Sequence, residues 1–186
     1  MRVRKFGDIF NEVAVRQMCM TWIEPPGKEF TPRDCWLLEY YCDPPDCDCP
    51  IVVLEACSCE EPKLLATIMF GWESFEFYQD TCAADDDTLH ALRQGTLDPS
   101  GPTDEMAGIV LEVVQKEFLS NPKVVARFKR HHEMHLREMR KRSRLSAKDA
   151  GSARVGGVTD SKRNRRSLLR LSPGRVRKPR WRFDGI

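Results

Sequence analysis

Runs of branched and aromatic residues, separated by polar segments, mark the middle of this chain as the region of its strands. Residues 36–41, 51–57 and 64–70 are rich in such side chains. Consecutive strands with short connections pair most simply with their neighbours in the chain. We therefore predict a three-stranded antiparallel meander.

Two later segments carry apolar residues at helical spacing. A helix is predicted over residues 103–119, with Thr103 as its N-cap. Asn121 and Pro122 provide the N-cap and first residue of a second helix, predicted over residues 122–142. Both helices are expected to pack on the meander.

Three weaker patterns predict shorter helices. Apolar spacing favours a helix over residues 8–20, and the aromatic residues of segment 72–78 fall three to four apart. The acidic run 85–87 is expected to cap a brief helix that reaches Arg93. Together these elements predict one α+β domain over residues 1–142, in which C-terminal helices pack on a small antiparallel sheet.

The hydrophobic pattern ends after Met139, and charge takes its place. Residues 143–186 contain few apolar side chains, so they cannot offset chain entropy and are predicted to form a disordered basic tail. Residues 1–136 hold 13 Lys and Arg against 24 Asp and Glu, whereas residues 137–186 hold 17 against 4. The chain is therefore an acidic body with a basic arm rather than a uniformly basic nucleic-acid-binding domain.

The composition also bears on location and on the state of the cysteines. No apolar run approaches the roughly 20 residues that cross a bilayer, and residues 1–8 lack the apolar segment of a secretory signal. We therefore expect a cytoplasmic protein with no membrane partner. In a reducing cytosol its 8 cysteines are free thiols or metal ligands. A secreted fold held by disulfides is the alternative.

Three of the cysteines lie close together in a C-x4-C-x-C segment. Cys42, Cys47 and Cys49 supply three of the about four ligands that zinc takes in a tetrahedral site. Pro44 and Pro45 stiffen the turn and so lower the entropy lost when the loop closes around an ion. We predict a zinc site here, and inert packing of the thiols and redox pairing are the alternatives.

The fourth ligand is expected from the last predicted helix. His131, His132 and His135 lie on or beside its apolar stripe, which should face the sheet. A core-facing imidazole needs a polar partner, and a cation bound by thiolates would supply one. We choose His131 as the fourth ligand, with its neighbours as alternatives.

The other cysteines are weaker candidates. Cys57 and Cys59 form a second pair in a polar turn, and this pair is less suited to metal ligation than the C-x4-C-x-C segment. Free cysteine is among the most buried residue types, so we expect structural roles for Cys19, Cys35 and Cys82.

Cations in the tail alternate with rings that can stack on bases. This pattern is typical of segments that bind nucleic acid without sequence preference, with an affinity that weakens as salt rises. The residues that we expect to take part are Arg163, Arg165, Arg166, Arg175, Arg177, Lys178, Arg180, Trp181 and Arg182. A solvated tail held by its own acidic body is the alternative.

Three features of the chain occur together: Tyr41 with the C-x4-C-x-C segment, Gly71-Trp72-Glu73 after a strand, and a late Lys129-Arg130-His131 step. In these features, over about residues 36–136, the chain resembles an uncharacterised group of bacterial proteins. Some members of that group end in a small cysteine-rich metal-binding module, whereas this chain ends in arginines. The resemblance implies a structural metal in the body and supplies no activity.

Three functions compete. The first is a metal-stabilised binding or adaptor domain with a protein partner, because closed thiolate-rich zinc sites are typically structural. The second is association with nucleic acid through the tail. The third is a metal-dependent enzyme, yet the sequence has no G-x-S-x-G, P-loop, H-E-x-x-H or dinucleotide fingerprint. We favour the first, and we predict no catalytic residue.

Overall fold

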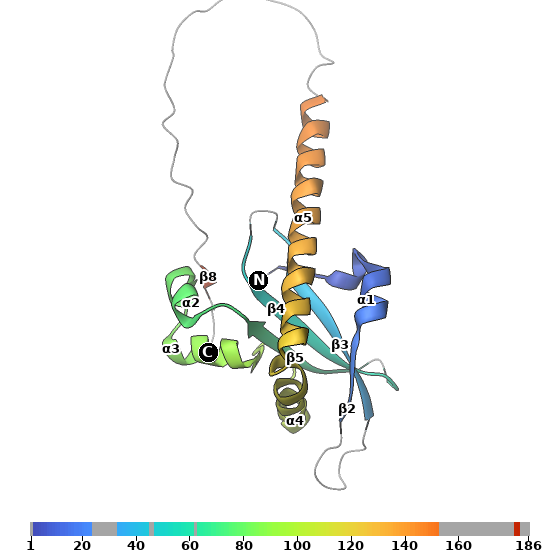
Figure 1. The fold of residues 1–186 in the computed structure, drawn as a ribbon, viewed down its shortest axis with the longest axis vertical. Helices are drawn as coiled ribbons and strands as arrows, with labels where there is room; N and C mark the ends of the chain where they lie inside the picture. Colours follow the sequence, from blue (N-terminus) through green and yellow to red (C-terminus); the bar gives the residue numbers. More distant parts are fainter. Residues whose placement is uncertain (1, 24–32, 45–46, 62, 153–180, 183–186) are drawn as a thin grey trace, which may run out of the picture.

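An antiparallel sheet with helices on both of its faces forms the body of the protein (Figure 1). The computed structural model describes residues 2–23, 33–44, 47–61, 63–152 and 181–182. In chain order its elements are β1 (Val3–Lys5), the 3-10 helix η1 (Phe6–Asp8), α1 (Asn11–Gln17), β2 (Cys19–Ile23), β3 (Arg33–Cys42), β4 (Ile51–Ser58), β5 (Leu64–Gly71), α2 (Phe75–Thr81), β6 (Cys82–Ala83), α3 (Asp86–Gln94), β7 (Thr96–Leu97), α4 (Glu105–Val114), the π-helix η2 (Gln115–Leu119), α5 (Pro122–Ser152) and β8 (Trp181–Arg182).

The predicted meander is confirmed and lies at the centre of a larger sheet. β3 pairs with β4 and β4 with β5, both antiparallel, with Leu37 opposite Ala56 and Leu54 opposite Ile68. The six-stranded sheet has the order β1-β3-β4-β5-β7, and β2 also pairs with β3. β1, β2 and β7 are short, and the sequence pattern did not predict them. The α+β fold class is therefore as predicted.

The predicted helix over residues 8–20 is right only for its middle part. Helix α1 covers Asn11–Gln17, and β2 begins at Cys19. Cys19 and Ile23 are buried in β2, whereas Met20 and Trp22 are about half exposed, at 53% each. This alternation has the period of two that a strand requires, and pairing with β3 overrides the weaker helical spacing.

Helix ends agree with the sequence in two places and differ in a third. Asn121 caps α5 by accepting a hydrogen bond from Lys123 N at 3.0 Å, and Asp85 caps α3 as expected. The cap of α4 is Asp104 rather than Thr103. Its carboxylate accepts from the backbone N–H of Ala107 at 2.9 Å, and a carboxylate there also suits the positive end of the helix dipole.

Helix α5 is longer than predicted, and part of the expected tail belongs to it. The helix runs to Ser152, beyond the predicted end at residue 142. Arg, Lys, Leu and Ala have high helix propensity, so the helix continues although residues 143–146 are exposed. The remainder of the predicted disordered tail lies outside the described residues, apart from Trp181–Arg182, which form β8 parallel to β6.

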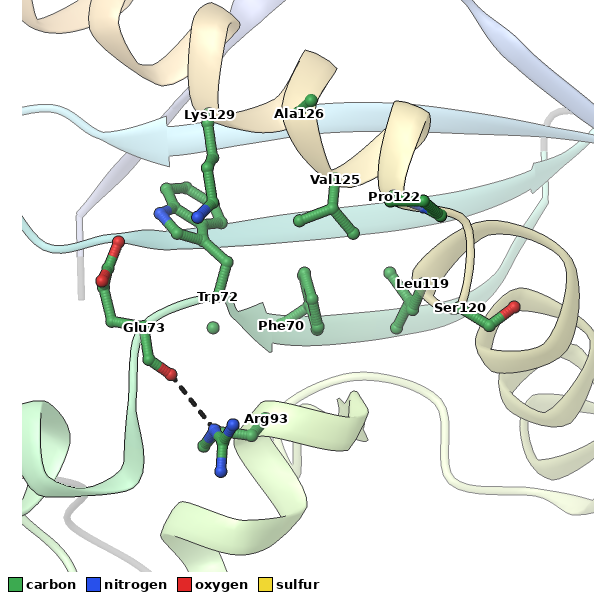
Figure 2. Close-up of a pocket in the computed structure, with 11 residues that line it drawn as sticks. Phe70, Trp72, Glu73, Arg93, Leu119, Ser120, Pro122, Val125, Ala126 and Lys129 are labelled. Atoms are coloured by element: carbon green, nitrogen blue, oxygen red, sulfur yellow. Dashed lines mark hydrogen bonds between the residues drawn. The ribbon is translucent and has the colours of Figure 1, made fainter.

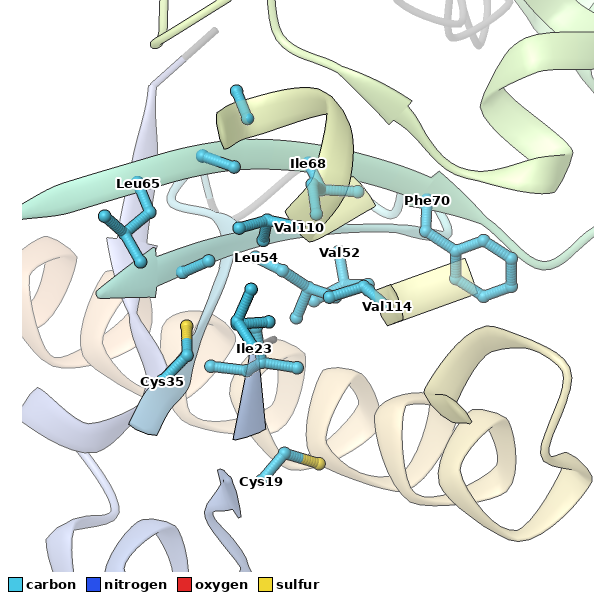
Figure 3. Close-up of a cluster of buried hydrophobic side chains, with 14 of the residues drawn as sticks. Cys19, Ile23, Cys35, Val52, Leu54, Leu65, Ile68, Phe70, Val110 and Val114 are labelled. Carbon is cyan, nitrogen blue, oxygen red and sulfur yellow. The ribbon is translucent and has the colours of Figure 1, made fainter. Parts of the chain in front are cut away.

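Two hydrophobic clusters cover the two faces of the sheet. On one face, Val110 and Val114 of α4 pack over Val52, Leu54 and Ile68 of the central strands (Figure 3). The other cluster contains residues from α2, α3 and the three cysteines of the C-x4-C-x-C segment. None of the helices in the described part of the chain combines the length and apolar composition that a bilayer crossing requires.

Candidate metal centre

The connection between β3 and β4 folds back on itself and gathers three cysteines. Cys42 is the last residue of β3, and Cys49 lies shortly before β4. The N–H of Cys47 donates to the carbonyl of Pro44 at 3.0 Å, and that of Ile51 donates to the carbonyl of Cys49 at 2.9 Å. These tight turns bring residues from both sides of the connection to one place.

The three predicted cysteine ligands converge. The sulfur atoms of Cys42, Cys47 and Cys49 lie within 4.8 Å of one another, and the three residues are 2%, 3% and 5% exposed. The sulfurs of Cys42 and Cys49 are 3.1 Å apart, well beyond the roughly 2.05 Å of a disulfide. Sulfurs that share one tetrahedral zinc at about 2.3 Å would be roughly 3.8 Å apart. The group can therefore hold a metal ion.

The charges of these thiols are strongly coupled. Hydrogen bonds accepted from Cys42 and Cys49 lower the pKa of Cys47. Donating such bonds raises the pKa of Cys49 and, with burial, also that of Cys42. The pocket thus stabilises one thiolate and resists a second, because a further negative charge would be buried beside the first. A bound cation would remove that repulsion, so the electrostatics of the pocket are compatible with a metal ion.

The structure places His131, the predicted fourth ligand, elsewhere. Its Nδ1 lies 2.7 Å from Oε2 of Glu39, and its Nε2 lies 3.0 Å from Oε1 of Gln17. The ring also stacks on Phe6 with centroids 4.3 Å apart. Both ring nitrogens are thus engaged away from the cysteines, and the assignment of His131 as a ligand is corrected.

Glu39 is the centre of a buried polar network that the sequence analysis missed. Its Oε2 accepts from the hydroxyl of Tyr41 at 2.8 Å as well as contacting His131. Its Oε1 lies 3.5 Å from the guanidinium of Arg127. The signal was present in β3, where Glu39 lies two residues from buried Leu37 and two from buried Tyr41, on the same face of the strand, and so points inward. A carboxylate at such a position requires partners.

The other two histidines of α5 carry ring nitrogens without partners. Nε2 of His135 donates to the carbonyl of Cys42 at 2.9 Å, which leaves Nδ1 as a buried acceptor. Nε2 of His132 is also buried and has no hydrogen-bond partner in the described part of the chain. Burial lowers the pKa of both histidines, while the nearby charge of Cys47 acts in the opposite direction on His132. Neutral imidazole is the form that binds metals.

Aromatic rings and an ion pair enclose the site. The ring of Trp72 meets His132 edge-on at 5.3 Å, and Tyr41 lies 5.7 Å from both histidines. Asp43, next to Cys42, forms an ion pair with Arg4 of β1 at 2.5 Å. The hydrogen bond from Arg4 lowers the pKa of Asp43.

Trp72, whose ring contacts His132, also lines a cavity of about 480 Å³ (Figure 2). Phe70 and Val125 line the floor of this cavity, and Arg93 lies at its rim, where it donates to the carbonyl of Glu73 at 3.1 Å.

The remaining cysteines do not join a second group of ligands among the described residues. Cys19, Cys35 and Cys82 are buried, as expected for structural thiols, and burial raises the pKa of Cys35 to about 12. Cys57 and Cys59 are partly exposed. The structure thus offers metal ligation at one cysteine cluster within the ranges it describes.

The predicted nucleic-acid-binding residues of the tail cannot be placed at a site. Arg163, Arg165, Arg166, Arg175, Arg177, Lys178 and Arg180 lie outside the described residues, and Trp181 and Arg182 are described only as the backbone of β8.

Comparisons with protein-family models, with curated proteins and with solved structures gave no match for this chain. The resemblance to the bacterial group therefore stays a prediction.

Proposed function

We propose that this protein is a binding domain stabilised by one zinc ion, which is held by Cys42, Cys47, Cys49 and His132. One observation carries the proposal: the three buried sulfurs lie within 4.8 Å of each other. A buried nitrogen of His132 without a hydrogen-bond partner among the described residues supports the choice of the fourth ligand. Thiolate and imidazole ligands in such a set suit zinc, which prefers four-coordinate sites of sulfur and nitrogen.

His132 is preferred over its neighbours as the fourth ligand. His131 uses both ring nitrogens, and His135 uses Nε2 to hold the carbonyl of Cys42. No histidine belongs to the group of ligand atoms that lie within 4.8 Å of one another among the described residues, so ligation requires the His132 ring to move toward the sulfurs. The His135 bond would then orient the end of β3 from outside the ligand set.

A structural role for the ion follows from its surroundings. The cysteines are almost fully buried, so a fourth ligand from α5 would leave no open position for a substrate. The ion would join the β3–β4 connection to α5, two parts of the chain that lie far apart in sequence. The body would then be a rigid platform for a partner, which supports an adaptor rather than an enzyme.

Metal analysis of the purified full chain tests the proposal. We expect about one zinc per chain, since four protein ligands complete one site. Cys42→Ser, Cys49→Ser and His132→Asn should lower the zinc content. Cys82→Ser and His131→Asn are matched controls, because they remove a buried thiol and a buried imidazole outside the ligand set.

Cobalt substitution adds a readout that does not depend on stability. Co²⁺ bound by thiolates gives an intense charge-transfer absorption, which should weaken when Cys47 is replaced by serine. A purified chain that holds no stoichiometric metal and shows no cobalt–thiolate band would contradict the proposal. If His132→Asn bound cobalt and zinc as well as the wild type does, the assignment of His132 as the fourth ligand would be contradicted. The assignment of the three cysteine ligands would stand.

A further inference from the structure

The C-terminal part of α5 leaves the body of the protein. Met139, at 5% exposure, is the last buried residue within the part of the helix whose burial is described, and residues 140–146 are all exposed. Figure 1 shows this upper part of α5 standing clear of the sheet and of the other helices. A helix without packing partners gains no stability from burial there, so its side chains are available to another molecule.

Four cations share one face of this projecting helix. Arg137, Arg140, Lys141 and Arg144 are spaced by three and four residues, which places them one above another over about 10 Å of helix. We call these four residues the basic face of α5.

The basic face points away from the rest of the protein. The helix packs on the body through Phe128, His132, His135 and Met139. At about 100° per residue, the four cations centre about 160° from that buried stripe. Their presentation to solvent is therefore fixed by the packing of the same helix.

Little negative charge opposes the basic face. Arg140 and Arg144 form no ion pair with a described residue. Arg137 and Lys141 meet only Glu133 at 3.5 Å and Glu138 at 3.9 Å, both on α5 itself. Exposed pairs of this kind are weak, and like charges at these helical spacings repel one another.

We propose that the basic face of α5 binds the phosphate backbone of duplex DNA without sequence preference. The helix, about 10–12 Å across, matches the roughly 12 Å major groove, which lets its cations reach phosphates. Residues 137–146 contain no aromatic side chain to stack on single-stranded bases, which favours a duplex. Leu145 is the exposed apolar residue there, at 52%, too little for insertion into a membrane surface.

The four contacts set the expected salt dependence. Each neutralised phosphate adds about −0.9 to the slope of log K against log salt, so four add about −3.6. Between 50 and 200 mM salt, the basic face alone should account for a loss of affinity of about 150-fold.

Fluorescence anisotropy with a labelled duplex of random sequence tests the proposal in the full chain. The test variant carries Arg137→Ala, Arg140→Ala, Lys141→Ala and Arg144→Ala, since alanine preserves helix propensity. We expect the slope to lose about 3.6 in magnitude relative to the wild-type slope. The matched control carries Lys63→Ala, Lys116→Ala, Lys123→Ala and Lys129→Ala, which remove the same charge from exposed positions on the body and should keep most of the slope.

Three outcomes would overturn the proposal. The first is wild-type affinity and slope in the basic-face variant, with its circular dichroism unchanged. The second is an equal loss in the control, which would assign binding to net charge rather than to this face. The third is binding of the wild type to phosphatidylserine vesicles, reduced in the basic-face variant, with no binding to the duplex.

Discussion

Replacing Glu39 should destabilise the protein more than replacing any exposed acidic residue of α5. The carboxylate is 9% exposed and contacts Tyr41, His131 and Arg127 at 2.8, 2.7 and 3.5 Å. In Glu39→Gln the amide oxygen can still accept from Tyr41, but the Arg127 guanidinium, 16% exposed, loses its counter-charge. Breaking a buried pair from one side costs about 3–5 kcal/mol, and the partial exposure of Arg127 places this case at about 3 kcal/mol.

Urea unfolding followed by far-ultraviolet circular dichroism measures this loss. In a chain of this length, about 3 kcal/mol corresponds to a fall of about 6–12 °C in the melting temperature. Glu133→Gln is the matched control, because Glu133 is 65% exposed and its ion pair with Arg137 spans 3.5 Å. It should change the free energy of unfolding by less than about 0.5 kcal/mol.

A double-mutant cycle sharpens the reasoning. Arg127→Met should cost less in the Glu39→Gln background than in the wild type, because the uncompensated cation is then already present. A Glu39→Gln protein as stable as the wild type, or a coupling energy near zero with Arg127, would refute the view that this network holds α5 on the sheet.

Three further predictions concern packing, capping and metal binding. Gly71→Ala would place a Cβ 2.5 Å from the hydroxyl of Tyr78 and should cost about 1–3 kcal/mol in urea unfolding; an unchanged midpoint would contradict the close approach. Asp104→Ala should cost about 1 kcal/mol and Thr103→Ala almost nothing in the same assay, and equal losses would remove Asp104 as the cap. Free zinc at about 100 times its dissociation constant should stabilise the fold by about 2.7 kcal/mol, so a chelator should lower the melting temperature in the wild type but not in Cys42→Ser.

The central strands were predictable because their signal is local. Residues 51–57 begin with the β-branched Ile51, Val52 and Val53, and β4 is buried on both faces. β2 was not predictable in the same way. Met18 and Met20 fit the helical spacing of the preceding segment, and only pairing with β3 selects the alternating pattern.

The candidate site was half predictable for a related reason. Three cysteines within one short turn must lie close together, so their convergence needed little knowledge of the fold. The choice among His131, His132 and His135 depends on the rotation of α5 to within a fraction of a turn. The inward position of Glu39 bears on this choice, because its carboxylate contacts Nδ1 of His131, whereas Nε2 of His132 has no hydrogen-bond partner among the described residues.

Helix α5 connects the two proposals, and its packing also separates them. Phe128 and Met139 are buried, and the Glu39 network holds His131, and none of these residues belongs to the proposed ligand set. These contacts set the rotation of the helix and hence the direction of the basic face. Binding of duplex DNA should therefore persist in Cys42→Ser, measured by anisotropy below its melting temperature. If DNA binding disappeared together with zinc, the zinc ion rather than the buried stripe would set the rotation of α5. The metal would then also determine the direction of the basic face.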